Sequence, residues 1–264
     1  MSNDKSTLDG WMNSVPEEEN SLYDEALRLY EGKRFKEALV LINVAIEHDS
    51  SSWKFYDLKG NILRFMDRFT ESKRAFDEAL EIKNDESVLK NKVEMMYTWA
   101  NSLNDKKKAL EIIVEAIDIL PDNVDGVKFL YLKGSIYDCL SQPIEARKAY
   151  LTAEGEFEEV ERLQAQEDFI KNSKDTLINI TGTQFYYGLE VFAPGVIVDL
   201  MAEPTNPHDK DAIRVEIEGE TVGYVANSDY TVLDNITCAS DISDAKKAEI
   251  MFIYLEGYVI AKII

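Results

Sequence analysis

The sequence predicts two unlike parts, an array of repeated helical hairpins followed by a small, mainly β barrel. The first observation is a pattern of small and large apolar residues that returns four times before residue 160. The second is a change of period near residues 173–175, after which short apolar stretches with strand character follow. The third is composition, because Ala, Leu, Glu and Lys are common in the first part whereas β-branched and turn residues gather in the second.

The repeated unit is a helix with a small residue, a large apolar residue four positions later and an alanine three positions after that. Offsets of 4 and 7 lie on one helix face, so the small residues let a neighbouring helix approach while the large residue fills the gap. The three sets are Ala38, Ser72, Ala109 and Ala146; Ile42, Phe76, Ile113 and Tyr150; and Ala45, Ala79, Ala116 and Ala153. The steps between copies are 34, 37 and 37 residues.

A second amphipathic segment precedes each of these helices. Gly60 and Gly134 lie twelve residues before the small residue of their copies, Ala26 holds the same place in the first copy, and Pro121 marks the end of the third. Together these features resemble the tetratricopeptide repeat, a helix–turn–helix unit of about 34 residues, over residues 19–160. The third copy is loose in its first helix, and the spacing of copies three and four indicates a few inserted residues.

This resemblance implies a curved solenoid whose concave face, lined by the first helices, binds an unknown protein or peptide. The candidate groove residues are Lys54, Asn61, Arg64 and Tyr131, with Tyr23, Leu27, Tyr30 and Asp138 beside them. In some members of the family, Lys, Asn and Arg at such places hold the C-terminal carboxylate of a peptide. Lys54, Asn61 and Arg64 match that set in part, because Tyr23 and Leu27 stand where polar residues would be needed. A solvated face and an aromatic peptide groove are the alternatives.

Two segments flank the repeats. We expect residues 1–18 to form a flexible N-terminal arm, in which Trp11 and Met12 have no assigned role. We expect residues 155–174 to form a capping helix and linker, since a terminal repeat must cover its exposed apolar face. The apolar stripe of Phe157, Val160 and Leu163 supports a helix there.

Residues 175–264 are expected to form a barrel of about six strands. Strands are expected at 177–180, 195–200, 213–217 and 221–225, with a tight hairpin link at 218–220. We expect a short helix over residues 228–235 with Ser228 as its N-cap. The tail, residues 248–264, is expected to hold one long or two shorter strands with a kink or bulge at Gly257.

Two segments of this part are unusually specific in sequence. Residues 182–188 read GTQFYYG, residues 203–213 read EPTNPHDKDAI, and VGYV follows at 222–225. They resemble the HIRAN domain, whose pattern is G-x-x-aromatic-aromatic, then E/D-P-x-N-P-x-D-x-x-A-I, then V/I-G-aromatic-or-His. The resemblance implies an OB-like barrel that holds the 3′ end of single-stranded DNA.

By this resemblance, Phe185 and His208 lie at positions that stack the last bases. Asp209 accepts the terminal 3′-hydroxyl, and Asn206 shapes its loop. Stacking contributes about 1–3 kcal/mol per base and suits any base. The candidate nucleic-acid-binding set is Phe185, Tyr186, Asn206, His208, Asp209 and Tyr224. The alternative is structural: Asp209 caps backbone amides in a turn, and Phe185 and Tyr186 belong to the core.

At several positions this sequence lacks the basic residue or histidine that the family pattern has. Gln184 stands where a basic residue contacts phosphate, Tyr224 replaces a frequent His, and Asn227 replaces a Lys. Residues 175–264 hold 5 basic and 15 acidic residues, a net charge of −10 within −21 for the chain. Lys210 and Arg214 are the cations near the motif. This charge argues against a large phosphate-binding surface.

Other function classes are not expected. The sequence has no G-x-x-x-x-G-K-[ST] loop and no G-x-S-x-G elbow, and its two histidines and two cysteines have no metal-ligand spacing. We therefore expect no enzyme, cofactor or metal. The longest apolar run has six residues, so we expect no membrane span. The N-terminus lacks secretory-signal features, and the sparse cysteines favour a cytoplasmic location.

The sequence thus predicts a non-enzymatic adaptor. Its repeats would bind a protein, and its HIRAN-like barrel would bind single-stranded DNA 3′ ends or damaged DNA. The alternative is a protein-only scaffold, in which the barrel binds a protein partner or is structural.

Overall fold

The computed structural model describes residues 19–228, 230–242, 246–255 and 257–264. The chain divides into two compact units, Met1–Gly155 and Glu156–Ile264. Residues 1–18, which the sequence predicts to be a flexible arm carrying Trp11 and Met12, lie outside the described residues. No helix in the described ranges is long and apolar enough to cross a bilayer.

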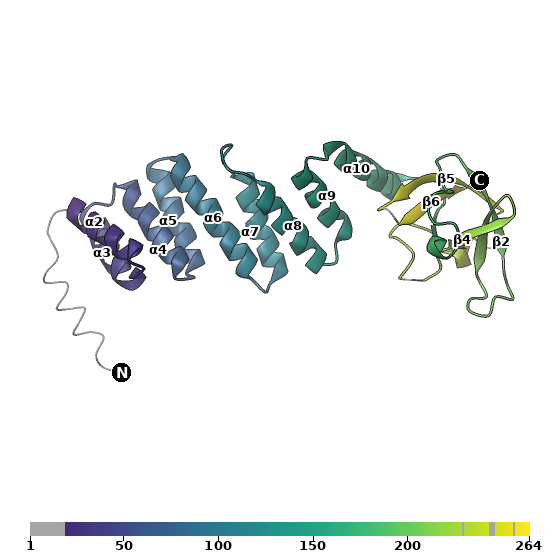
Figure 1. Cartoon of the computed structure of the whole chain (residues 1–264), viewed down its shortest axis with the longest axis horizontal. Helices are drawn as coiled ribbons and strands as arrows, with labels where there is room; N and C mark the ends of the chain where they lie inside the picture. The colour runs from purple at the N-terminus through teal and green to yellow at the C-terminus, as the bar shows by residue number, and fades with distance from the viewer. Residues whose placement is uncertain (1–18, 229, 243–245, 256) are drawn as a thin grey trace. The chain divides into compact units, whose positions relative to one another are not determined.

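The first unit contains four helical hairpins packed one after another (Figure 1). Their helices are α2 Glu19–Glu31 and α3 Phe35–His48, α4 Trp53–Phe65 and α5 Phe69–Ile82, α6 Glu86–Ser102 and α7 Lys106–Asp118, and α8 Val127–Cys139 and α9 Pro143–Glu154. Each helix packs mainly against its neighbours along the chain, as the repeats of a solenoid do. The predicted helical array is confirmed.

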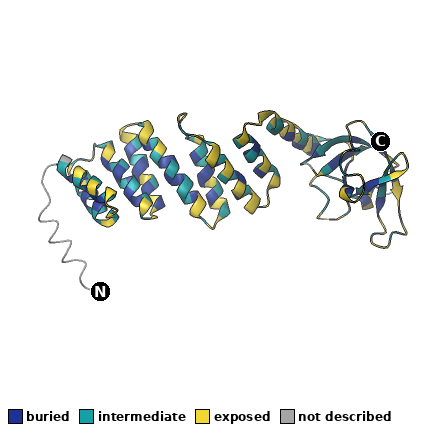
Figure 2. Ribbon diagram, viewed as in Figure 1, coloured by how far each residue is buried: buried dark blue, intermediate teal, exposed yellow. Residues whose placement is uncertain are grey.

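The spacing of small and large residues sets the distance between the two helices of a hairpin. A Cβ atom on Gly60 would lie 2.7 Å from the ring of Phe76, and one on Gly134 would lie 2.5 Å from the ring of Tyr150. The hydroxyl of Ser72, which is fully buried, donates to the carbonyl of Gly60 at 2.7 Å. Glycine in the first helix therefore makes room for the large residue of the second. Figure 2 shows the buried residues on the faces where helices meet.

The turn inside three of the hairpins has one conformation. Lys33, Asp67 and Ser141 have φ of 58°, 58° and 57°, and the amide of the following residue donates to the carbonyl five residues before it. This left-handed residue closes the helix end. Within the described ranges the third hairpin has no such residue, and α6 has 17 residues where α4 has 13. The longer α6 accounts for part of the inserted length in the sequence.

Aromatic stacking joins successive repeats. Phe35 stacks on Phe65 with ring centroids 5.3 Å apart and planes 6° apart, and Phe69 stacks on Trp99 at 6.1 Å and 11°. The two pairs stand 34 residues apart in sequence. Each ring at the start of a second helix thus packs on the end of the next first helix.

The second unit contains α10 (Phe157–Asn172) and a closed barrel of six antiparallel strands (Figure 1). The strands are β1 Leu177–Thr181, β2 Ile197–Ala202, β3 Ile213–Ile217, β4 Glu220–Val225, β5 Lys247–Tyr254 and β6 Tyr258–Ile263. They pair in the order β1–β4–β3–β2–β5–β6, and β6 returns to β1. Apolar side chains such as Ile180, Val198 and Val215 fill the core. The predicted mainly β barrel is confirmed.

The connections of the barrel agree with the sequence in part. Glu218 and Gly219 have φ of 53° and 85° and form the predicted tight link between β3 and β4. The tail forms two strands, and Gly257 lies in the turn between them. The predicted short helix over residues 228–235 is wrong, because residues 228 and 230–235 form turns. The hydroxyl groups of Ser228 and Thr231 instead meet at 2.9 Å.

Helix α10 packs on the barrel. The ring of Phe169 meets that of Phe252 on β5 at 5.7 Å, and Gln166 Nε2 donates to the carbonyl of Ile253 at 3.4 Å. The division between the units falls before this helix. These contacts attach α10 to the barrel, and a cap for the repeats at residues 155–174 stays a prediction.

Gly60→Val should lower the free energy of unfolding of the first unit by about 1–3 kcal/mol, because the new side chain overlaps the ring of Phe76. The measurement is urea unfolding followed by tryptophan fluorescence, which reports the first unit because Trp53 and Trp99 lie there and Trp11 precedes them. Adding Phe76→Leu should restore part of the loss. Equal stability of Gly60→Val and the wild type would refute the packing.

Lys33→Gly should raise the free energy of unfolding by about 1 kcal/mol, because glycine adopts a left-handed backbone without the penalty that a side chain brings. The matched control is Lys90→Gly inside α6, which should lower it by about 1 kcal/mol. Both are read by the same tryptophan fluorescence. A loss of stability in Lys33→Gly would contradict the described turn.

Candidate functional site

The GTQFYYG segment forms a loop that exposes aromatic side chains. Gly182 and Gly188 have φ of 73° and 70°, which favours glycine at both ends of the loop. Between them, residues 183–185 form one 3₁₀ turn (η1), in which Thr183 is buried and its carbonyl accepts the amides of Tyr186 and Gly188. Phe185 is 80% exposed. The alternative that Phe185 belongs to the core is therefore wrong.

Tyr186 connects this loop to β4. It is partly exposed, and its ring centroid lies 6.3 Å from that of Tyr224. Gly223 lets β4 approach β1, since a Cβ there would lie 2.9 Å from the carbonyl oxygen of Thr181. The VGY sequence thus brings Tyr224 to the aromatic loop.

The carboxylate of Glu203 joins three parts of the barrel. Its Oε1 accepts from Arg214 Nη1 on β3 at 2.7 Å. Its Oε2 accepts from the hydroxyl of Tyr224 on β4 at 3.1 Å and from Asn206 Nδ2 at 3.0 Å. Glu203 belongs to the EPTNPHDKDAI motif but is absent from the predicted site residues, because its position after β2, within reach of β3 and β4, is a tertiary feature.

Asn206 organises the loop that carries His208 and Asp209. Its Oδ1 accepts the amide of His208 at 3.0 Å and the amide of Asp209 at 3.4 Å. The His208 side chain is exposed. The loop therefore presents both predicted contact residues from a fixed turn.

The carboxylate of Asp209 is held from two sides. Its Oδ1 accepts the amide of Asp211 at 2.9 Å, and its Oδ2 accepts from Asn227 Nδ2 at 2.8 Å. Asn227 is fixed in turn, because its Oδ1 accepts the amide of Ser240 at 2.9 Å. The predicted alternative of an Asp209 cap on backbone amides is thus partly correct, and Asn227, noted in the sequence only as a lost cation, orients the carboxylate.

These bonds keep Asp209 ionised. Donation by Asn227, then by the amide of Asp211, lowers the pKa of the Asp209 carboxyl below its usual 3.8, and the nearby charge of Lys210 acts in the same direction. At neutral pH the group is a carboxylate, which accepts hydrogen bonds and donates none.

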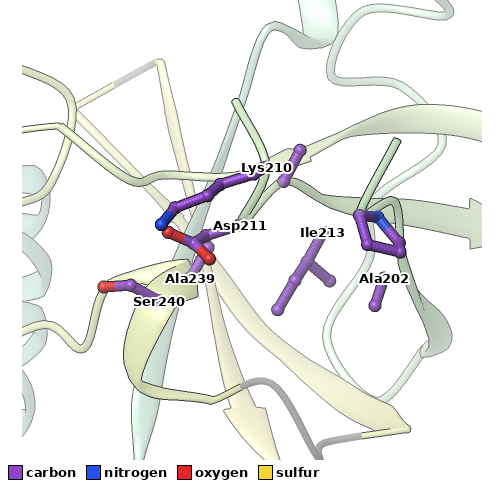
Figure 3. A pocket seen from close by; sticks show the side chains of 8 residues that line it. Ala202, Lys210, Asp211, Ile213, Ala239 and Ser240 are labelled. Carbon is purple, nitrogen blue, oxygen red and sulfur yellow. The ribbon is translucent and has the colours of Figure 1, made fainter. Parts of the chain in front are cut away.

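A pocket of about 240 Å³ opens beside this loop (Figure 3). Lys210, Asp211 and Ser240 provide its polar lining, and Ile213 and Ala202 lie toward its other side in the figure. Ser240 also belongs to the chain of bonds that ends at Asp209. The pocket therefore lies beside the Asp209 loop, whose next two residues, Lys210 and Asp211, line it.

Most cations of the barrel are engaged by carboxylates. Arg214 contacts Glu203 and Glu216, both at 2.7 Å, and Lys247 and Lys262 contact Asp199 and Glu249 at 3.3 and 3.5 Å. In the described ranges, Lys210 and Lys246 have no ion pair. Within those ranges no group of three or more His, Cys, Asp or Glu side chains could hold a metal ion. Little positive charge is left for phosphate groups.

The structure thus connects most of the predicted nucleic-acid-binding set. A chain of contacts runs from Tyr186 through Tyr224 and Glu203 to Asn206, whose loop carries Asp209. Phe185 precedes one end of this chain and is exposed. These contacts therefore link Tyr186 to the Asp209 loop through the fold, and Phe185 is the exposed sequence neighbour of Tyr186.

Two candidate groove residues of α4 make polar contacts, Arg64 to the next repeat and Asn61 within its own helix. Arg64 Nη2 donates to the hydroxyl of Thr98 at 3.3 Å, and Asn61 Nδ2 donates to the carbonyl of Asp57 at 3.0 Å. Asp57 also accepts from Asn91 Nδ2 at 2.9 Å. The pairs Arg64–Thr98 and Asp57–Asn91 each span 34 residues, one repeat. These polar groups stabilise the stacking of the repeats.

The remaining groove residues are more accessible. Lys54 is exposed, with its Nζ 6.0 Å from the centroid of the Trp53 ring. Tyr131 is 43% exposed, and its hydroxyl lies 3.5 Å from Glu154 Oε1. In the described ranges no contact joins Lys54 to Asn61 or Arg64, so the carboxylate-binding trio is not assembled by direct contacts.

A helical repeat array followed by a closed β barrel defines the class of this protein. The family models agree: residues 54–86 match the tetratricopeptide repeat and residues 174–253 match the HIRAN domain. The chain contains these two domains in that order. The first match covers α4 and α5, the second of the four hairpins.

Several solved structures are similar to part of the chain. MamA is 18% identical, with a TM-score of 0.40 over 61% of this chain and 86% of that chain. YrrB, described as a TPR protein with an unusual peptide-binding site, is 15% identical, with a TM-score of 0.31 over 56% of this chain and 92% of that chain. A MamA fragment from Desulfovibrio magneticus RS-1 is 14% identical, with a TM-score of 0.30 over 57% and 99%. No curated protein matches the chain.

Tyr224→Phe should lower the stability of the barrel by about 1 kcal/mol, because it removes the bond to Glu203. Burial and then the hydrogen bonds to Tyr186 and Glu203 raise the pKa of Tyr224 to about 12 from 10.0. Because the pKa of Tyr224 is higher in the folded state than in the unfolded state, the protonated hydroxyl stabilises the fold. The stability difference between the wild type and Tyr224→Phe should therefore be complete below pH 10 and should vanish between pH 10 and 12.

Calorimetry of the full chain from pH 8 to pH 12 measures this difference. The barrel transition is the one that Gly60→Val leaves in place. A difference between wild type and Tyr224→Phe that persists unchanged at pH 12 would show that the hydroxyl does not titrate as described.

Proposed function

We propose that the protein is a non-enzymatic adaptor whose repeats bind a protein partner and whose HIRAN domain binds the 3′ end of single-stranded DNA. The observation that carries the second half is that an 80% exposed ring, Phe185, and an oriented, ionised carboxylate, Asp209, lie on two loops that the contacts of Tyr224 and Glu203 connect. A ring stacks on any base. A carboxylate accepts a hydroxyl group and repels a terminal phosphate.

The geometry around Asp209 suits this role. Asn227 and the amide of Asp211 fix the two oxygens in place, so that little side-chain freedom is lost when a ligand binds. The pocket beside the loop, with Ile213 and Ala202 in its lining, offers apolar surface next to the carboxylate. Nothing in this arrangement needs a cation at the terminus.

The repeats support the first half of the proposal. Solenoids of stacked hairpins offer extended binding surfaces, and the exposed Lys54 and Tyr131 lie on first helices, α4 and α8. The acidic balance of the chain, −21, favours partners that do not depend on a phosphate backbone. We propose that this unit binds a protein or peptide.

The test is fluorescence anisotropy of the full chain with a short single-stranded oligonucleotide labelled at its 5′ end. A free 3′-hydroxyl should bind and a 3′-phosphate should not. Phe185→Ala should weaken binding about tenfold, since one stacked base contributes about 1–3 kcal/mol. Asp209→Asn should abolish the preference for the hydroxyl end.

Two variants serve as matched controls. Phe157→Ala removes an exposed phenylalanine from α10, and Asp234→Asn changes an exposed aspartate for which the described residues show no hydrogen bond or ion pair. Neither should change the affinity. Binding that ignores the chemistry of the 3′ end would refute the proposed site.

The second candidate function is a protein-only scaffold. The observation that favours it is the engagement of Arg214, Lys247 and Lys262 by carboxylates, which leaves the barrel few cations for DNA. This candidate predicts no oligonucleotide binding even at low salt, where phosphate contacts are strongest.

A further inference from the structure

The hydrogen bonds of Asp209 leave half of its acceptor capacity open. A carboxylate has about four acceptor positions, two on each oxygen. Oδ1 accepts from the amide of Asp211 and Oδ2 accepts from Asn227, and no further donor to either oxygen is found in the described ranges. One acceptor position therefore remains on each of the two oxygens.

Two open positions on one fixed carboxylate match two hydroxyl groups on neighbouring carbon atoms. A deoxyribose terminus offers one hydroxyl group, whereas a ribose terminus offers the 2′- and 3′-hydroxyls as a vicinal diol. Carboxylates serve as ribose-hydroxyl acceptors in dinucleotide-binding folds, and the 2′-hydroxyl is the group by which a protein tells RNA from DNA.

The Asp209 carboxylate is held in one orientation, which makes it selective for a diol. Asn227 cannot turn away from Oδ2 without giving up the amide of Ser240, which its own Oδ1 accepts at 2.9 Å. The Asp211 amide belongs to the same loop as Asp209, which Asn206 closes. The two remaining acceptor positions therefore point in fixed directions relative to each other.

Because of the charges around the site, a larger share of the affinity must come from the terminal sugar. Lys210 is the one cation near Asp209 for which the described ranges show no ion pair, and Arg214 is held by two glutamates. Phosphate groups further along a strand therefore contribute little attraction. The terminal nucleotide, through its base on Phe185 and its sugar on Asp209, must provide most of the affinity.

We infer that this site prefers a ribose terminus with free 2′- and 3′-hydroxyl groups over a deoxyribose terminus. The inference rests on the proposed function and names the class of sugar that its site receives. The shared chemistry is a ribose vicinal diol, which the 3′ end of an RNA strand and a free ribonucleoside both carry.

The experiment compares four oligonucleotides that are identical DNA except in the last sugar. The sugars are 2′-deoxyribose, ribose, 2′-O-methylribose and 2′,3′-dideoxyribose, and binding to the full chain is measured by anisotropy. Ribose should bind about tenfold more tightly than deoxyribose, the factor expected of one more hydrogen bond to a charged acceptor. The 2′-O-methyl end keeps the ribose ring but lacks the second donor, so it should fall to the deoxyribose level.

Asp209→Asn should remove the preference for ribose, because the one amide oxygen, which still accepts from the amide of Asp211, has a single open acceptor position and cannot receive both hydroxyl groups. Asp234→Asn should leave the preference intact. Circular dichroism of both variants checks that the barrel is folded. A ribose preference that survives Asp209→Asn would overturn the inference.

The outcomes distinguish a failure of the ribose preference from a failure of the proposed function. Equal binding of the ribose and deoxyribose ends, both tighter than the dideoxy end, overturns the inference and leaves the proposed function standing. Equal binding of all four ends overturns both. Competition then distinguishes the two sources of the diol. Release of the ribose oligonucleotide by free adenosine or uridine would identify a nucleoside diol as the ligand. Release by an unlabelled strand alone would identify an RNA terminus.

Discussion

The candidate site depends on the hydrogen bonds that the carboxylate of Glu203 accepts. This carboxylate joins the end of β2 to Arg214 on β3, Tyr224 on β4 and Asn206 in the following loop. Without it, Arg214 would lose one of its two carboxylate partners, and the loop would lose its attachment to the strands. Through this one group the aromatic loop at Tyr186 and the Asp209 loop are parts of the same structure.

The ion pairs of the barrel determine which kind of ligand its surface suits. Arg214, Lys247 and Lys262 neutralise carboxylates of the barrel, so they stabilise the fold and are not free for phosphate. The candidate site itself exposes the ring of Phe185, the side chain of His208 and the fixed carboxylate of Asp209, with Lys210 as the neighbouring cation. Such a surface suits a ligand recognised by its flat base and its hydroxyl groups, at a strand end where phosphate charge is lowest.

Much of the fold follows from the sequence, whereas the links within the site do not. The offsets of 4 and 7 residues predicted the helical pairs, whereas the packing of a large ring on Gly60 and Gly134 is seen only in the structure. The helix expected at 228–235 is replaced by turns, in which the amides of Thr231 and Val232 donate to the carbonyl of Ser228 and the amide of Ile236 donates to the carbonyl of Leu233. The hydrogen-bond partners of Glu203 and Asn227 lie 3 to 21 positions away in the sequence, and the folding of the barrel brings them together.

Nuclear magnetic resonance of the full chain with ¹⁵N labels tests the proposed site at its own atoms. An oligonucleotide with a free 3′-hydroxyl should shift the signals of the backbone amide of Asp211 and the side-chain amide of Asn227, the two donors to Asp209, together with that of the amide of Phe185. A 3′-phosphate should leave these three signals in place. Binding that shifts other parts of the barrel and leaves these signals unchanged would contradict the central claim.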